Sequence, residues 1–230
     1  MSLVLPAFYP ILDIDVARAR ALRPLDVLTA WLDAGVTLVQ LRAKSLDAAD
    51  LLALADQCSQ ATRAAGARLI VNDRVDVAVL SGADGVHVGQ DDLPPAAVRR
   101  LLPAPALVGW STHTPAQLEA AAAMPIDYVA IGPVFETRSK AQPDPVVGLE
   151  GVRQAVALAA GRPVVAIGGI TLDRVSDVLA AGASSMAVIG DVLHAEAGPR
   201  ARAFLAAARQ VGSTKSEVRS QKFEFSRRSK

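Results

Sequence analysis

The 230-residue sequence has little cysteine, few aromatic residues and no long apolar run. Cys58 is the only cysteine, which excludes an internal disulfide and a cysteine-rich metal site. No apolar stretch approaches the roughly 18 residues of a membrane-spanning helix, so no membrane partner is expected. The first residues lack the basic region that opens a signal peptide, and we expect a cytoplasmic protein. Because aromatics make up only 4% of the chain, aliphatic residues must fill the core, which favours layered strands and helices.

The formal net charge is only +1, and it is unevenly distributed. Residues 214–230 contain six basic and two acidic residues, which leaves 18 basic and 21 acidic residues elsewhere. A slightly acidic body gives no net-charge basis for a nucleic acid partner, and none is expected. We predict one catalytic domain over residues 1–212, followed by a basic, disordered tail over residues 213–230.

Short apolar runs alternate with stretches of helical periodicity along the whole body. The eight runs are FYPIL, TLVQLR, RLIVN, GVHV, LVGWS, YVAIG, VVAIGG and MAVIG. Such alternation predicts parallel strands with helices outside them, and eight units predict a closed (β/α)8 TIM barrel. An open doubly wound sheet is the alternative, but a glycine-rich fingerprint does not follow the first run. Active sites of these barrels lie at the carboxyl ends of the strands, where this sequence repeatedly places polar residues.

The second run, VQLRAK, ends in two cations and an amide. Because side chains alternate along a strand, Gln40, Arg42 and Lys44 share one face while Val39 and Leu41 share the other. Arginine offers a planar fork of donors and lysine a point charge, which suits an anion with several oxygens. The alternative is that these three polar side chains only face solvent at the end of the strand and bind no ligand.

The third and fourth runs both end in acidic residues. Asn72 and Asp73 follow one run, and Asp91 and Asp92 follow the next. Two carboxylates from neighbouring strand ends could hold Mg²⁺, which takes oxygen ligands and often shares them with a diphosphate. The alternatives are turn chemistry and, for Asp92, capping of the helix that starts near Pro94. We select Asp73 and Asp92 as the metal ligands, with Asp91 as the rival.

The fifth run ends in GWSTH. Gly109 and Ser111 share a face, which leaves room and one hydroxyl, and we predict that Ser111 bonds a ligand. The surrounding residues do not form a nucleophile elbow, so covalent catalysis by serine is not expected. His87 is either a core histidine or a ligand contact, and the loop surface is one place open to His113, whose role the sequence does not determine.

Two loops complete the predicted site. The long loop after the sixth run brings Thr137, Ser139 and Lys140, and loops of this length are often lids or binding loops, with a flexible surface loop as the alternative. The seventh and eighth runs end at Gly169 and Gly190, where backbone amides of such barrels often bind phosphate. The sequence therefore predicts two anion sites and two phosphorylated small-molecule substrates.

These motifs, taken in order, resemble the thiamine phosphate synthase family over about residues 8–211. The resemblance rests on QLRAK, NDR, GVHVGQDDL, GWSTH, YVAIGPVFETRSK, GLEG and AIGGI. It implies a (β/α)8 barrel that joins a hydroxymethylpyrimidine diphosphate to a thiazole phosphate and releases diphosphate, with Mg²⁺ as cofactor. The residues it would assign to the pyrimidine diphosphate are Gln40, Arg42, Lys44, Asn72, Ser111 and Lys140.

The resemblance also assigns the remaining roles. Asp73 and Asp92 would bind Mg²⁺, and the catalytic group would be Arg42, Lys44, Lys140 and Ser111. The thiazole phosphate would contact Thr137, Ser139, Gly169, Ile189 and Gly190.

The sequence departs from the family pattern on the thiazole side. Ser139 stands where a second threonine is usual, and Gly190-Asp191 stands where Ser-Ala is frequent. An acidic Asp191 beside a phosphate is unfavourable unless it points away to cap the next helix.

Three rival functions are a thiazole tautomerase-like isomerase, a non-catalytic phosphate-ligand-binding protein and a Schiff-base aldolase that uses Lys44. The sequence leaves a homo-oligomer open.

Overall fold

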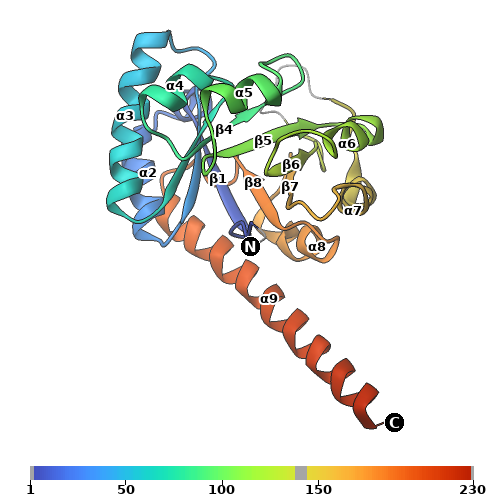
Figure 1. The fold of residues 1–230 in the computed structure, drawn as a ribbon. Coiled ribbons are helices and arrows are strands. Elements are labelled where there is room, and N and C mark those ends of the chain that lie inside the picture. Colours follow the sequence, from blue (N-terminus) through green and yellow to red (C-terminus); the bar gives the residue numbers. More distant parts are fainter. Residues whose placement is uncertain (1–2, 138–143, 229–230) are drawn as a thin grey trace.

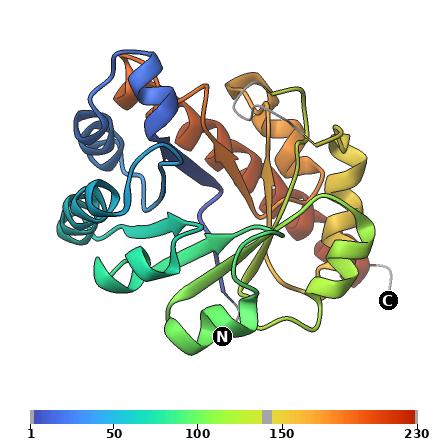
Figure 2. The same cartoon turned by 90° about the horizontal axis from the view of Figure 1, so that it is seen from above.

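Eight parallel strands close into a barrel in which each strand pairs with its neighbours in chain order. This computed structural model describes residues 3–137 and 144–228, and the side chains of residues 213–228 are outside that description. Figure 1 shows the barrel from the side, and Figure 2 shows the helices surrounding the strands from above. The predicted (β/α)8 TIM barrel is confirmed, and the open sheet is excluded.

The element bounds follow the expected alternation. The strands are β1 (Phe8–Asp13), β2 (Leu38–Arg42), β3 (Arg68–Asn72), β4 (Gly85–Val88), β5 (Leu107–Thr112), β6 (Tyr128–Ile131), β7 (Val164–Ile167) and β8 (Ser185–Val188). The helices are α1 (Ile14–Ala19), α2 (Pro24–Asp33), α3 (Ala48–Ala64), α4 (Val75–Leu80), α5 (Pro95–Leu101), α6 (Pro115–Ala121), α7 (Gly148–Leu158), the 3-10 turn η1 (Leu172–Arg174), α8 (Val175–Ala180) and α9 (Ala197–Arg228).

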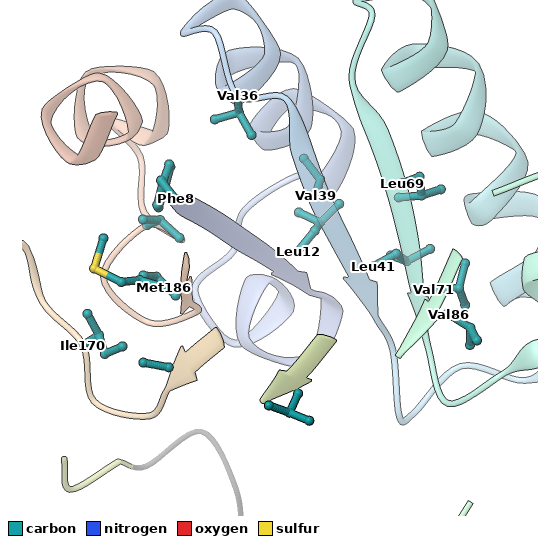
Figure 3. Close-up of a cluster of buried hydrophobic side chains, with 14 of the residues drawn as sticks. Phe8, Leu12, Val36, Val39, Leu41, Leu69, Val71, Val86, Ile170 and Met186 are labelled. Carbon is teal, nitrogen blue, oxygen red and sulfur yellow. The ribbon is translucent and has the colours of Figure 1, made fainter. Parts of the chain in front are cut away.

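Alternation along each strand divides the apolar residues into two cores. The larger core lies between the strands and the helices, and Figure 3 shows part of it, including Leu12, Val39 and Leu41. A smaller core fills the barrel interior and contains Tyr9 and Tyr128. Val39 and Leu41 therefore point outward, while the alternate residues of β2 point into the barrel, so the two faces that the sequence predicted for this strand are confirmed.

Local signals in the sequence explain where several helices begin and end. Thr114 caps α6 through a capping box with Gln117, as the Thr-Pro-x-Gln pattern indicates. Gly35 and Gly182 follow the ends of α2 and α8 with φ of 94° and 105°, a region that favours glycine. These helix ends return the chain to the next strand and so set the repeating unit of the barrel.

The last helix extends beyond the predicted domain boundary. α9 runs to Arg228, and Figure 1 shows its C-terminal half directed away from the barrel. Residue 212 therefore does not coincide with the end of an element, and the division into a domain and a disordered tail stays a prediction. Within the described part of the chain, the helices are all too short or too polar to cross a membrane.

Candidate active site

A cavity of about 580 Å³ opens at the carboxyl ends of the strands. Its walls come from every part of the chain, from Tyr9 in β1 to Asp191 after β8. The predicted substrate residues that line it are Gln40, Arg42, Asn72, Ser111, Thr137, Gly169, Ile189 and Gly190. Ser139 and Lys140 lie outside the described residues. The structure thus gathers residues that are far apart in sequence around one cavity, while their binding roles stay predictions.

Arg42 is held in place by a buried acid that the sequence analysis did not select. Asp13, the last residue of β1, is fully buried and forms an ion pair with the Arg42 guanidinium. Its carboxylate also accepts a hydrogen bond of 3.0 Å from the backbone N–H of Val16 and so caps α1. Because β1 and β2 pair Asp13 with Arg42 in register, the pair follows from the barrel itself. The pairing restricts where Arg42 can present its remaining donors.

Lys44, Asp73 and Asp92 form a second charged group just beyond the ends of β2 to β4. The Lys44 ammonium pairs with the Asp73 carboxylate. Burial raises the pKa of Asp73, Lys44 opposes that shift, and the neighbouring Asp92 carboxylate raises the pKa further. Asp73 also has φ of 62°, an uncommon region for a residue with a side chain. The two acids selected from sequence therefore lie close enough to interact.

The arrangement fits a divalent cation that is shared with a ligand. Within the described residues, no group of three or more His, Cys, Asp or Glu side chains could hold a metal ion. Two interacting carboxylates suit Mg²⁺, which commonly takes one or two protein acids together with phosphate oxygens and water. Asp92 is half-buried and interacts with Asp73, whereas Asp91 is exposed. Asp92 does not cap α5 but accepts a 2.8 Å hydrogen bond from the backbone N–H of Gly89.

A chain of hydrogen-bonded polar side chains crosses the barrel interior and lines the cavity. The Gln40 amide donates to the Tyr9 hydroxyl at 3.0 Å, and the hydroxyls of Tyr9 and Tyr128 are 3.2 Å apart. The His87 ring bonds the Tyr128 hydroxyl at 3.2 Å and the Ser111 hydroxyl at 2.8 Å. Burial raises the pKa of both tyrosines, so their hydroxyls stay protonated. His87 therefore orients Ser111 instead of standing alone in the core.

Gly109 does not leave room for a ligand, contrary to the sequence prediction. A Cβ atom at Gly109 would lie 2.1 Å from the Tyr128 ring and 2.4 Å from the His87 ring. These two rings stack with centroids 5.6 Å apart and fill the space that the glycine opens. The glycine serves the packing of the polar chain and is not among the residues that line the cavity, whereas Ser111 and Thr112 from the same strand end are.

His113, whose role the sequence left open, lies just after β5 and lines the cavity as well. It is half-buried, and its Nδ1 atom lies 2.7 Å from the backbone oxygen of Gly132, a glycine directly after β6. The position follows from β5 and β6 pairing side by side, which brings their two loops together.

A second wall of the cavity is built from backbone at the ends of β7 and β8. Gly168 and Gly169 have φ of 101° and 62°, and a Cβ atom at Gly169 would lie 2.3 Å from the Glu136 backbone oxygen. Only glycine lets the loop after β7 approach the loop after β6 this closely. Gly190 is less confined, since its nearest neighbour would be the Arg20 guanidinium at 3.7 Å.

Asp191 is engaged by other residues of the wall. Its carboxylate accepts three hydrogen bonds of 2.6–3.0 Å from Arg200 and one of 2.8 Å from the backbone N–H of Leu172. The expected alternative, a cap on the following helix, is therefore not what the structure contains. Asp191 instead caps η1 and pairs with an arginine of α9, which offsets its charge.

The site residues that sequence analysis missed include Tyr9, Asp13, Arg20, Tyr128 and Arg174. Alternation could have found the first two, because Tyr9, Ile11 and Asp13 share a face of β1 just as Gln40 and Arg42 share a face of β2. Arg20 and Arg174 lie in helical segments, where strand parity gives no information.

Comparison with known proteins agrees with this geometry. A family model described as thiamine monophosphate synthase matches residues 8–192. The thiamine-phosphate synthase of Koribacter versatilis is 45% identical over 204 residues, which cover 88% of this chain and 94% of that protein. The corresponding protein of Methanoculleus marisnigri is 44% identical over 185 residues, covering 80% and 86% respectively.

A solved structure gives the same result. Thiamine phosphate pyrophosphorylase from Pyrococcus furiosus superposes with a TM-score of 0.80 at 29% identity, covering 90% of this chain and 96% of that one. Family match, sequence identity and barrel geometry point the same way, and the chain belongs to the thiamine monophosphate synthase family.

Proposed function

We propose that this chain is a transferase of thiamine biosynthesis that joins a hydroxymethylpyrimidine diphosphate to a thiazole phosphate, giving thiamine phosphate and diphosphate. One observation carries the proposal: a single cavity has an arginine held by a buried acid at the end of β2 and the tightly packed glycines Gly168 and Gly169 after β7. Such a cavity suits two anionic substrates that meet between the walls. The family relationship supports the same reaction.

In the proposed reaction the diphosphate leaves first, as the bond between its oxygen and the pyrimidine methylene carbon breaks. Arg42, Lys44 and Lys140 offset the charge that develops on the leaving group. The aminopyrimidine stabilises the methylene cation, and the thiazole nitrogen then forms the new C–N bond with that carbon. Positioning of the two substrates provides much of the rate, so a covalent enzyme intermediate is not required.

Mg²⁺ is the proposed cofactor, and Asp73 and Asp92 would hold it. When bound, the ion neutralises diphosphate charge and so assists its departure. Gln40, Asn72 and Ser111 would orient the pyrimidine diphosphate, while Thr137, Ser139, Gly169, Ile189 and Gly190 would hold the thiazole phosphate. A cytoplasmic location and a homo-oligomer remain predictions.

The test mixes the full chain with both substrates, with and without Mg²⁺, and measures diphosphate and thiamine phosphate together. We expect the two products in equal amounts, only when both substrates are present, with loss of turnover on chelation and recovery on addition of Mg²⁺. Isomerisation of the thiazole without diphosphate release would instead support a tautomerase. Tight binding of both substrates without product would support a non-catalytic binding protein.

A further inference from the structure

Two arginines flank the glycine wall, and the proposed reaction has not yet used them. Arg20, at the end of α1, donates from Nη1 to the backbone oxygens of Gly190 and Leu193, each at 2.6 Å. Arg174, in η1, donates from Nη1 to the backbone oxygen of Gly169 at 2.8 Å. Both side chains line the cavity. Each guanidinium is therefore attached to the carbonyl of one wall glycine and faces the space beside it.

The hydrogen bonds to the backbone oxygens leave further N–H donors of both guanidinium groups available. A guanidinium has five N–H donors, and Nη1 makes all the hydrogen bonds that Arg20 and Arg174 form with described residues. The Arg174 guanidinium also lies 4.2 Å from the centre of the Phe135 ring, which restricts its orientation. The Arg20 Nη2 atom lies over Gly190, 3.7 Å from the position of a Cβ atom there. Preoriented, charged donors of this kind suit a phosphate.

The acidic residues near the glycine wall indicate why a phosphate site there would need Arg20 and Arg174. Asp191 places a carboxylate beside the wall and uses the backbone N–H of Leu172, a donor that a phosphate could otherwise receive. Arg200 offsets the Asp191 charge but is engaged with both carboxylate oxygens. Glu136 also lines the cavity, although it is exposed. Attraction of a phosphate dianion at this wall therefore needs further positive charge, and Arg20 and Arg174 supply it.

We propose that Arg20 and Arg174 bind the phosphate of the second substrate and make the site selective for the phosphorylated thiazole over the thiazole alcohol. The proposal deepens the proposed function, since it rests on a thiazole phosphate being the second substrate. Under this proposal, the Arg20 and Arg174 side chains bind the phosphate together with the backbone amides of the wall, which would otherwise bind it alone.

The first test does not depend on turnover. Inorganic phosphate is titrated against the full chain, and its affinity is measured by calorimetry for the unmodified protein and for Arg20→Gln and Arg174→Gln. We expect each variant to bind phosphate about tenfold more weakly, the effect of losing one charged hydrogen-bond donor. Arg23→Gln is the matched control, because Arg23 is exposed and pairs with Asp26 outside the cavity, and its affinity should be unchanged.

The second test measures selectivity. The ratio of kcat/KM for thiazole phosphate to that for the thiazole alcohol should fall about tenfold in each glutamine variant, while KM for the pyrimidine diphosphate is unchanged. A purely structural role of either arginine would lower both rates together and keep the ratio. An arginine whose variant keeps both the ratio and the phosphate affinity has no such role, which would overturn the proposal for that residue.

Two further outcomes are distinguishable. If the unmodified chain makes no product but binds phosphate through both arginines, the proposed function fails and the phosphate site stands. If Arg20→Gln does not fold, Arg20→Lys keeps the charge without the planar fork and should bind phosphate with intermediate affinity. Unchanged affinity in a folded Arg20→Lys variant together with unchanged affinity in Arg174→Gln would contradict the proposal.

Discussion

The two walls of the cavity differ in how they are made to face an anion. The wall at the ends of β2 and β3 has long cationic side chains nearby, and each pairs with an acid. Arg42, which lines the cavity, pairs with Asp13, and Lys44, which is not among the lining residues, pairs with Asp73. The wall of β7 and β8 uses glycines: the conformation and packing of Gly168 and Gly169 after β7 exclude other residues, whereas Gly190 after β8 is less confined. The difference shows two ways to face an anion. At the first wall, ion pairs set the charge that the side chains present to a ligand, whereas at the second wall the backbone conformation sets the form of the wall. Substitution of the cations at the first wall should therefore affect mainly activity, whereas substitution of the buried partner Asp13 or of the confined Gly169 should affect mainly stability.

The largest effect is expected from Arg42→Ala. Loss of this cation from the site of the leaving group should lower kcat for diphosphate release roughly 100- to 1,000-fold. Arg153→Ala is the control, since Arg153 is exposed on α7 and pairs with Glu150. Turnover of Arg42→Ala at the unmodified rate would show that the first wall does not act on the diphosphate.

Asp13→Ala should cost about 3 kcal/mol of unfolding free energy, because it removes a helix cap and leaves Arg42 without its buried partner. Urea denaturation measures this loss. Asp47→Ala is the matched control, since Asp47 caps α3 through the Asp50 N–H and is exposed, so about 1 kcal/mol is expected. Equal losses in the two variants would mean that the pair with Arg42 contributes nothing.

Gly169→Ala and Gly190→Ala test the second wall directly. Alanine at residue 169 must adopt φ of 62° and would collide with the Glu136 backbone, so a loss of about 2 kcal/mol in stability is expected. Alanine at residue 190 meets only Arg20 at ordinary contact distance, so its stability should change by less than about 0.5 kcal/mol. A reversed order, measured by thermal denaturation, would contradict the account of this wall.

The smallest effect is expected at Cys58, which lies on α3 behind the first wall. Burial raises the pKa of its thiol to about 12, so almost no thiolate exists near pH 8. The native protein should therefore resist a thiol-alkylating reagent that labels the urea-unfolded chain fully. Arg42→Ala should resist equally if its defect is chemical, and rapid labelling would show that the barrel has loosened.

The barrel and the cations of the first wall could be predicted from sequence because both depend on local patterns, whereas the acid that holds Arg42, Asp13, was missed. Apolar runs located the strands, and alternation placed Arg42 on the inward face and Val39 outward. Prediction failed where a residue contacts a partner from a segment distant in sequence. Nothing near Gly109 in sequence reveals that Tyr128 fills its place, and nothing near Asp191 reveals Arg200. Such partners are fixed by the closure of the barrel, which a linear reading does not contain.

The hydrogen bond from Arg20 to Gly190 joins residues separated by 170 positions and lies where β1 meets β8. During synthesis, the first strands leave the ribosome long before the loop that Arg20 must contact. The glycine wall is therefore completed only when nearly the entire polypeptide has emerged, so a nascent or prematurely terminated chain would lack this half of the site.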